Sequence, residues 1–195
     1  MFFKEEFGIS YEITPDQERF IAYDGPKFQY GEQQLTEGCL FQKSVRILFE
    51  RDITSQDLKI CNHSDSKAIF PVYNENSIFP FDVFAASFYI ISRYEEYLPH
   101  VCDHYNRFQP QDSILYEMGV MEKPIINIWA KELGNIIKSH YPDIQFKKKN
   151  FRFIPTYDID AAWAYKNKGV FRTSAAFLRD LLNLNFNEMK ERWSV

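Results

Sequence analysis

The stretch from Pro80 to Leu98 constrains the fold more than any other part of the chain. At helical spacing its large apolar side chains fall on one broad arc, and the polar face is narrow. The members of this arc are Val83, Phe84, Ala86, Phe88, Ile90, Ile91, Tyr94, Tyr97 and Leu98. Pro80 suits a first helical turn, Asp82 favours the positive end of the helix dipole, and Pro99 ends the run. The pattern predicts a helix over 80–98 that is covered on most sides and forms the centre of a globular domain.

Glu95 lies inside this apolar arc and is a candidate buried carboxylate. Buried acids are normally paired with a hydrogen-bond donor. We therefore expect an arginine, a tyrosine or a backbone N–H group to bind Glu95, which gives it a structural role.

The composition limits the classes of protein to which the chain can belong. Its 195 residues, 45% of them hydrophobic, suffice for one domain, or for one domain and a fragment of a second. The net charge of −4 provides no general attraction to nucleic acid or to anionic lipid. The start of the chain is too polar for a signal peptide, and no apolar run reaches membrane-spanning length. We expect a cytoplasmic protein that binds neither nucleic acid nor a membrane.

The three cysteines support a reducing compartment. Cys39, Cys61 and Cys102 are odd in number and lack the spacing of a CxxC motif. Such residues are typically buried free thiols.

The remaining periodicity predicts an α/β fold. Before the central helix, Ile9–Thr14, Arg19–Tyr23 and Lys27–Tyr30 are short β-rich runs separated by turn residues, which predicts an antiparallel hairpin or meander. After Pro124, apolar residues recur at spacings of three and four, which predicts a helix near 125–140. We expect a small mixed or antiparallel sheet packed against these two helices.

The strongest chemical signal follows a basic run at 147–149. A strand is predicted over Phe151–Asp160, and its alternation places Thr156, Asp158 and Asp160 on one face. Two carboxylates at the end of a strand form half of a site for a divalent cation or a general base. An Asp pair also caps helices, so spacing alone leaves both interpretations open. A helix starting near Thr173 is predicted beyond this strand.

Several segments resemble a known arrangement of domains. The segment FRFIPTYDIDAAWAYKNKG resembles the first motif of the polysaccharide deacetylases, which are metal-dependent carbohydrate esterases, in its divergent T-x-D-x-D form. The segments FPFDVFAASFYIISRYEEYLP, DHYNRF and KPIINIW resemble the domain of unknown function that precedes such deacetylase domains in some bacterial proteins. The resemblance implies an accessory α/β domain over 1–147 and, over 148–195, the truncated start of a deacetylase-like β/α domain.

The resemblance also implies roles for single residues. Asp158 would be the catalytic base and Asp160 a metal ligand, although the intervening Ile159 departs from the common form of the motif. The complete family domain uses a divalent metal, for which zinc is the expectation, and completes the site with a later His-x-x-x-His motif. No such motif follows Asp160, and the last histidine is His140. We expect this chain alone to bind no cofactor tightly and to be inactive as a deacetylase.

His100 and His104 imitate the absent motif. Histidines four residues apart on a helix can share a zinc ion. Pro99 and the polar character of the segment favour a surface loop instead. In this loop we expect Asp103 and Arg107 to form a charge-assisted bond that pins the loop to the central helix.

Two other function classes remain open. Pro15-Asp16 and Asp65-Ser66-Lys67 loosely imitate the metal-binding acids and the lysine of a nuclease, which is a remote alternative. The main expectation is a non-catalytic accessory region of a polysaccharide deacetylase-like protein, with carbohydrate as its partner. The alternative is a stand-alone interaction module whose exposed aromatic residues bind a protein or a second copy of the chain.

Overall fold

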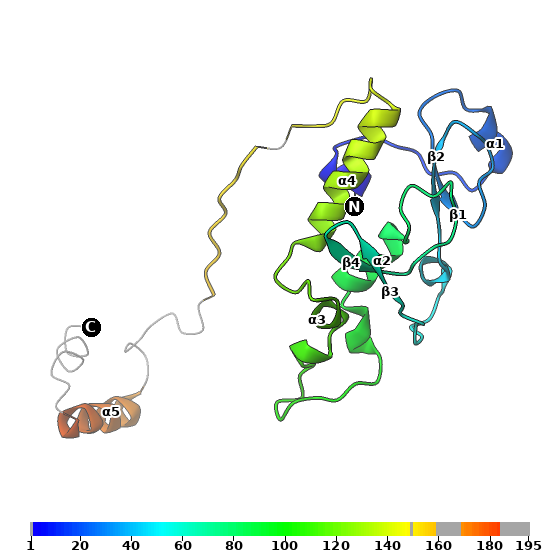
Figure 1. Cartoon of the computed structure of the whole chain (residues 1–195). Coiled ribbons are helices and arrows are strands. Elements are labelled where there is room, and N and C mark those ends of the chain that lie inside the picture. Colours follow the sequence, from blue (N-terminus) through cyan, green and yellow to red (C-terminus); the bar gives the residue numbers. More distant parts are fainter. Residues whose placement is uncertain (1, 149, 159–168, 184–195) are drawn as a thin grey trace. The chain divides into compact units, whose positions relative to one another are not determined.

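The computed structural model describes residues 2–148, 150–158 and 169–183. The chain divides into two compact units, Met1–Lys148 and Lys149–Val195. The first unit combines small two-stranded sheets with helices (Figure 1), which confirms the mixed α/β fold class. Within the described part of the chain, no helix is long and apolar enough to cross a membrane.

Two separate sheets form in the first unit. Strand β1 (Phe28–Gly31) pairs in parallel with β2 (Leu40–Lys43). Strand β3 (Ile60–His63) pairs antiparallel with β4 (Ser66–Ile69), and a tight turn joins them. The short helical turns of this unit include η1 (Phe2–Glu6), η2 (Arg46–Phe49) and η4 (Pro110–Asp112).

The predicted antiparallel meander near the start of the chain is wrong. Residues 9–14 form no strand, and the Arg19–Tyr23 run lies mostly within a helix, α1 (Gln17–Ala22). The reason is local, because the side chain of Asp16 accepts a hydrogen bond from the backbone N–H of Arg19 at 3.1 Å and caps the helix. Of the three predicted runs, only Lys27–Tyr30 overlaps a strand.

The central helix is shorter than predicted. Helix α2 spans Val83–Ile91, and a separate 3₁₀ turn, η3 (Tyr94–Tyr97), follows it. Arg93 adopts a left-handed backbone conformation with φ of 53°, which interrupts the helix. Ser92, just before the break, turns its hydroxyl back onto the carbonyl of Phe88 at 2.7 Å.

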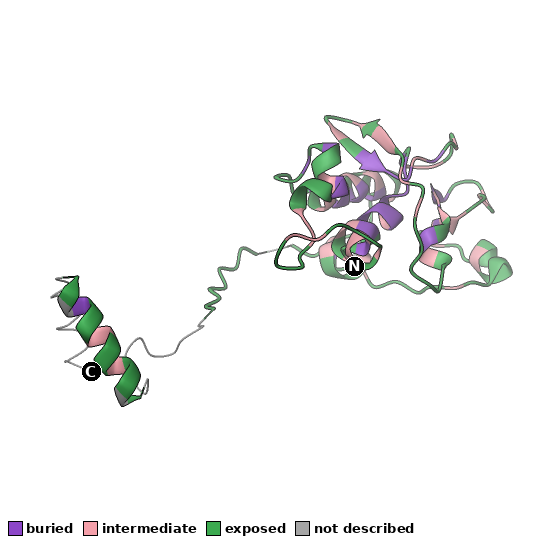
Figure 2. Ribbon diagram, turned by 90° about the horizontal axis from the view of Figure 1, so that it is seen from below, coloured by how far each residue is buried: buried purple, intermediate pink, exposed green. Residues whose placement is uncertain are grey.

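The core includes side chains from α2, from α4 (Ile125–His140) and from β4, and buried residues gather inside the first unit (Figure 2). The predicted helix near 125–140 is confirmed, and Trp129 and Leu133 on α4 are fully buried. The broad arc predicted for α2 is only partly covered, since Phe88 is 42% exposed. A short helix, α3 (Ile114–Met118), lies between α2 and α4 in the sequence.

A close approach at the middle of α4 joins the two ends of the first unit. The rings of Phe7 and Phe146 stack with centroids 4.8 Å apart. A Cβ atom on Gly134 would lie 3.0 Å from the ring of Phe7 and 3.2 Å from that of Phe146. The glycine costs helix stability, and the space that it leaves lets this ring pair pack against the helix.

Asp82 is a buried polar residue that connects several elements of the core. Its side chain is fully buried and caps α2 by accepting hydrogen bonds from the N–H groups of Phe84 and Ala85 at 3.1 and 3.0 Å. Its second oxygen accepts bonds from the hydroxyl of Tyr30 and the N–H of Val45, both at 2.7 Å. Burial raises the pKa of Asp82, and the four donors oppose that shift. Burial also raises the pKa of Tyr30.

The second unit differs from the predicted pattern at its start. Residues 151–158 form no strand, and Phe151, Phe153 and Tyr157 are 92%, 80% and 82% exposed. A strand needs a neighbour to satisfy its backbone groups, and none pairs with 151–158 among the described residues. The remainder of the predicted strand, 159–160, lies outside the described residues. Helix α5 (Val170–Leu182) overlaps the helix predicted near Thr173.

The bond between Tyr30 and Asp82 leads to a direct prediction. Replacing Tyr30 with Phe removes one donor to a buried carboxylate, so we expect the free energy of unfolding to fall by about 1–3 kcal/mol. Urea denaturation followed by circular dichroism measures this change. The matched control is Tyr116→Phe, because Tyr116 is 59% exposed. Equal stability of the two variants would contradict the assigned role of Asp82.

Candidate functional site

The two carboxylates that carried the strongest chemical signal are only partly described. Asp158 is exposed, on chain without regular secondary structure. Asp160 lies outside the described residues. Within the described residues, Asp158 belongs to no group of three or more His, Cys, Asp or Glu residues that could hold a metal ion.

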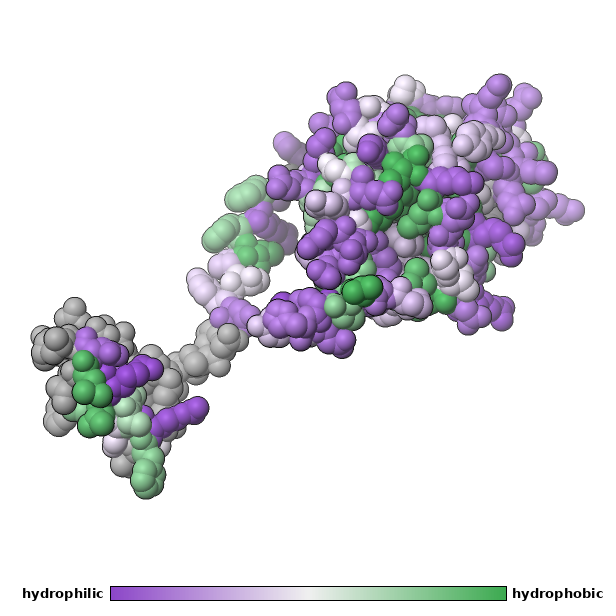
Figure 3. Space-filling model, turned by 60° about the horizontal axis from the view of Figure 1, so that its bottom comes forward, coloured by the Kyte–Doolittle hydropathy of each residue, from purple (hydrophilic) through white to green (hydrophobic). Residues whose placement is uncertain are grey.

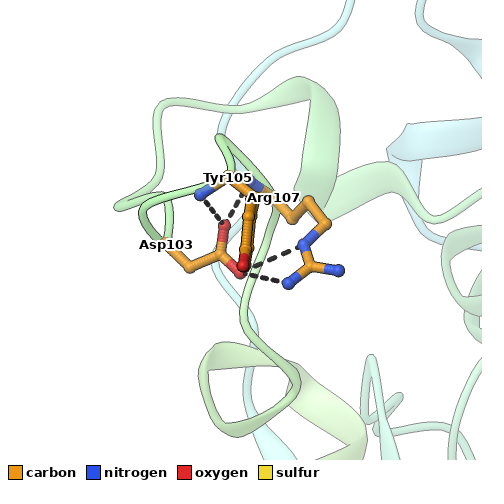
Figure 4. A network of polar contacts seen from close by, with 3 residues as sticks. All are labelled: Asp103, Tyr105 and Arg107. Atoms are coloured by element: carbon orange, nitrogen blue, oxygen red, sulfur yellow. Dashed lines mark hydrogen bonds and ion pairs between the residues drawn. The ribbon is translucent and has the colours of Figure 1, made fainter. Parts of the chain in front are cut away.

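A well-defined polar cluster occurs instead in the loop after η3. The carboxylate of Asp103 accepts hydrogen bonds from the backbone N–H groups of Tyr105 and Arg107, both at 2.9 Å. The guanidinium of Arg107 donates two more to its other oxygen, from Nε at 3.1 Å and Nη2 at 2.9 Å (Figure 4). The Asp103–Arg107 bond thus closes the loop on itself, whereas the sequence suggested a bond from the loop to the central helix.

Further contacts tighten this loop. The guanidinium carbon of Arg107 lies 4.7 Å from the centre of the Tyr105 ring, which is a cation–π contact. Asn106 adopts a left-handed backbone with φ of 60°, a conformation that asparagine tolerates better than most residues. Cys102 and Phe108 form an antiparallel bridge at the base of the loop. We call residues 102–108 the Asp103 loop.

Glu95 connects η3 to the next helix. It is half-buried, and its Oε2 accepts a hydrogen bond from the backbone N–H of Ile114 at 2.9 Å, at the first turn of α3. Burial raises the pKa of Glu95, and its bonds to Ile114 and Ser113 oppose this shift. A backbone N–H is one of the three partners that the sequence suggested for Glu95.

A hollow in the surface has Glu95 and Phe108, the last residue of the Asp103 loop, in its lining, and we call it the loop hollow. It has a volume of about 440 Å³ and is lined by Glu95, Leu98, Pro99, His100, Val101, Phe108, Gln109 and Asp112. Its lining is half apolar and half polar or charged, so it offers both apolar surface and hydrogen-bonding groups. Two of these residues drew attention in the sequence, Glu95 as a buried structural carboxylate and His100 as part of a zinc-like histidine pair. The hollow itself is not predicted from the sequence, because it arises from the shape of a loop that has no periodic pattern.

The two histidines of the loop lie in separate local environments. Nδ1 of His100 contacts the backbone carbonyl of Leu98 at 2.8 Å, and its ring packs edge-on against Phe108. The ring of His104 lies against Tyr105, with centroids 3.7 Å apart. Within the described ranges, no group of three or more His, Cys, Asp or Glu residues has the arrangement to hold a metal ion.

The residues of the nuclease-like pattern belong to separate elements. Asp16 caps α1, whereas Asp65 occupies the turn between β3 and β4 and Lys67 lies in β4. This arrangement assigns a local structural role to Asp16.

The sequence did not predict the partly buried pair of His63 and Glu132. Nε2 of His63 lies 2.8 Å from Oε2 of Glu132, and the imidazole also packs against the rings of Phe79 and Phe81. The pair joins β3 to α4 across 69 residues of sequence. No local pattern signals such a contact, because it depends on the tertiary packing of the hairpin on the helix.

The comparisons with known proteins identify the family. A model of a family of unknown function, DUF7033, matches residues 1–142, which fall within the first unit. The chain belongs to this family. The search of curated proteins and the search of solved structures both found no match.

The Asp103 loop leads to a prediction about pH. The N–H and the guanidinium of Arg107, with the N–H of Tyr105, hold the pKa of Asp103 below its ordinary value. Because the pKa is lower in the folded state, the stabilisation is present above the ordinary pKa of Asp and is lost as the pH falls through the lowered value. A carboxyl ¹³C NMR titration should show this lowered pKa, and Arg107→Leu should move it back towards the ordinary value. An ordinary pKa in the unmodified protein would contradict the assignment.

Proposed function

We propose that this chain is the N-terminal, non-catalytic region of a polysaccharide deacetylase-like protein that acts on an acetylated glycan, and that the loop hollow contacts the glycan. The resemblance of the segments around 80–108 and 151–169 supports the first part of the proposal. The observation that carries the second part is the loop hollow, with its combination of an aromatic ring, aliphatic side chains and hydrogen-bonding groups.

The lining of the hollow suits a sugar. A sugar ring has apolar C–H faces and a rim of hydroxyl groups. In the loop hollow, Phe108 and Leu98 provide apolar surface, while Glu95, Gln109 and Asp112 provide acceptors for hydroxyl groups. A hollow with both kinds of lining can contact the apolar face and the hydroxyl rim of the same sugar ring.

The hollow is held in shape before any ligand arrives. Asp103 fixes the loop on one side by four hydrogen bonds, and Glu95 fixes the start of α3 on the other. Binding therefore costs little ordering of the backbone, which favours affinity. This rigidity supports a binding role.

The catalytic role implied for Asp158 and Asp160 is kept outside this proposal. Zinc sites in enzymes normally present three protein ligands, and the described residues do not supply such a set. We therefore assign no metal-dependent step to this chain. In our proposal, a complete polysaccharide deacetylase domain supplies the metal and the hydrolysis.

A second function class, self-association, draws on a specific observation. Three tyrosines are largely exposed: Tyr97 on η3 (68%), Tyr105 in the Asp103 loop (66%) and Tyr116 on α3 (59%). The visible face of the first unit has apolar side chains scattered among polar ones (Figure 3). Such aromatic groups also occur at protein interfaces, so a dimer is the main competing explanation.

Calorimetric titration with N-acetylated chito-oligosaccharides and acetylated xylo-oligosaccharides tests the proposal. We expect saturable binding, a monomeric mass in solution and no release of acetate with added zinc. Phe108→Ala should weaken binding by about tenfold because it removes the ring that lines the hollow. Tyr116→Ala is the matched control, since Tyr116 does not line the hollow.

Two results would contradict this proposal. Absence of binding to both glycans, together with a dimeric mass, would favour the interaction module. Release of acetate that disappears in Asp158→Asn would show that the chain itself is a catalyst.

A further inference from the structure

We propose that the loop hollow prefers sugar units with a free amino group, such as glucosamine, over their N-acetylated counterparts. This inference rests on the proposed glycan-binding function and adds a ligand class to it. The accessory region would then hold the part of an amino-sugar polymer from which acetyl groups have already been removed.

The charge of the lining is the first argument. Two carboxylates, Glu95 and Asp112, line the hollow, and no lysine or arginine does. The nearest guanidinium in the sequence, Arg107, is engaged by Asp103 and stacked on Tyr105. A cationic sugar is therefore complementary to this surface, whereas a sugar acid would meet like charges.

The hydrogen-bonding character of the lining is the second argument. Nδ1 of His100 contacts the carbonyl oxygen of Leu98, which can only accept, so Nδ1 must carry the proton. In the neutral imidazole, Nε2 is then an acceptor. Glu95 and Asp112 add carboxylate acceptors, and Gln109 offers one amide acceptor and one amide donor group, so acceptors predominate among the side chains of the hollow. An ammonium group has three donors and no acceptor, whereas an acetamide adds a carbonyl oxygen that needs a donor.

The aromatic wall is the third argument. Phe108 lines the hollow, and the face of an aromatic ring attracts a cation. Replacing the ammonium with an acetamide removes both this attraction and the attraction to the carboxylates. The apolar wall contributes to the binding of both sugars. The amino group therefore determines which of the two sugars binds more tightly, and not whether a sugar binds.

The test compares two tetrasaccharides that differ only in acetylation. We expect the tetramer of glucosamine to bind about three- to fivefold more tightly than the tetramer of N-acetylglucosamine at low salt, as for a partly exposed ion pair. The preference should shrink as ionic strength rises. Asp112→Asn should abolish most of it, since Asp112 is exposed and its carboxylate lines the hollow.

The matched control is Asp65→Asn, which removes the same charge from the turn between β3 and β4. This control should keep the full preference. If it lowers the preference as much as Asp112→Asn, the amino sugar is attracted by the overall charge of the chain, and the inference is wrong.

The remaining outcomes separate this inference from the proposed function. Equal or tighter binding of the acetylated tetramer would overturn the preference and leave glycan binding in place. Binding of neither tetramer, together with no binding of the acetylated xylo-oligosaccharides, would overturn both. A preference that survives in both Asp112→Asn and Glu95→Gln would place it on another surface and would contradict the assigned site.

Discussion

One buried carboxylate organises the first unit. Asp82 accepts hydrogen bonds from Tyr30 on β1, from Val45 just after β2, and from Phe84 and Ala85 at the start of α2. A buried carboxylate is costly unless donors surround it. Because these four donors come from three segments, the chain satisfies Asp82 only when the parallel sheet, η2 and α2 are assembled together.

The position of the loop hollow follows from this assembly. Helix α2 starts at the residue after Asp82 and ends where Arg93 turns into a left-handed conformation. The η3 turn that follows places Glu95 where it can bind the start of α3, and the Asp103 loop lies between these two helices in the sequence. The hollow thus forms because α2 ends at this break and η3 follows. Apolar periodicity alone does not show the break, so the ligand-binding proposal depends on a feature that the structure supplies.

The sequence predicted the periodic parts of the fold well and the nonlocal contacts poorly. Helix α4 was predicted closely because its apolar residues recur at helical spacing over sixteen residues. Asp82 was recognised as favouring a helix start, but its bond to Tyr30 spans 52 residues and has no local signal. The Arg19–Tyr23 run became mostly helical because capping by Asp16 outweighed β propensity. At the loop, Asp103 and Arg107 were recognised as partners, whereas the hollow beside them depends on how Glu95 and Phe108 come together in space.

The most direct test of glycan binding at the loop hollow is to map the backbone amide shifts by NMR during titration with an N-acetylated chito-oligosaccharide. We expect the largest shifts on residues that line the loop hollow, such as His100, Phe108 and Gln109. The hairpin of β3 and β4 should stay unchanged. Shifts that centre on the hairpin or on α1, with the residues of the hollow unaffected, would contradict glycan binding at the loop hollow.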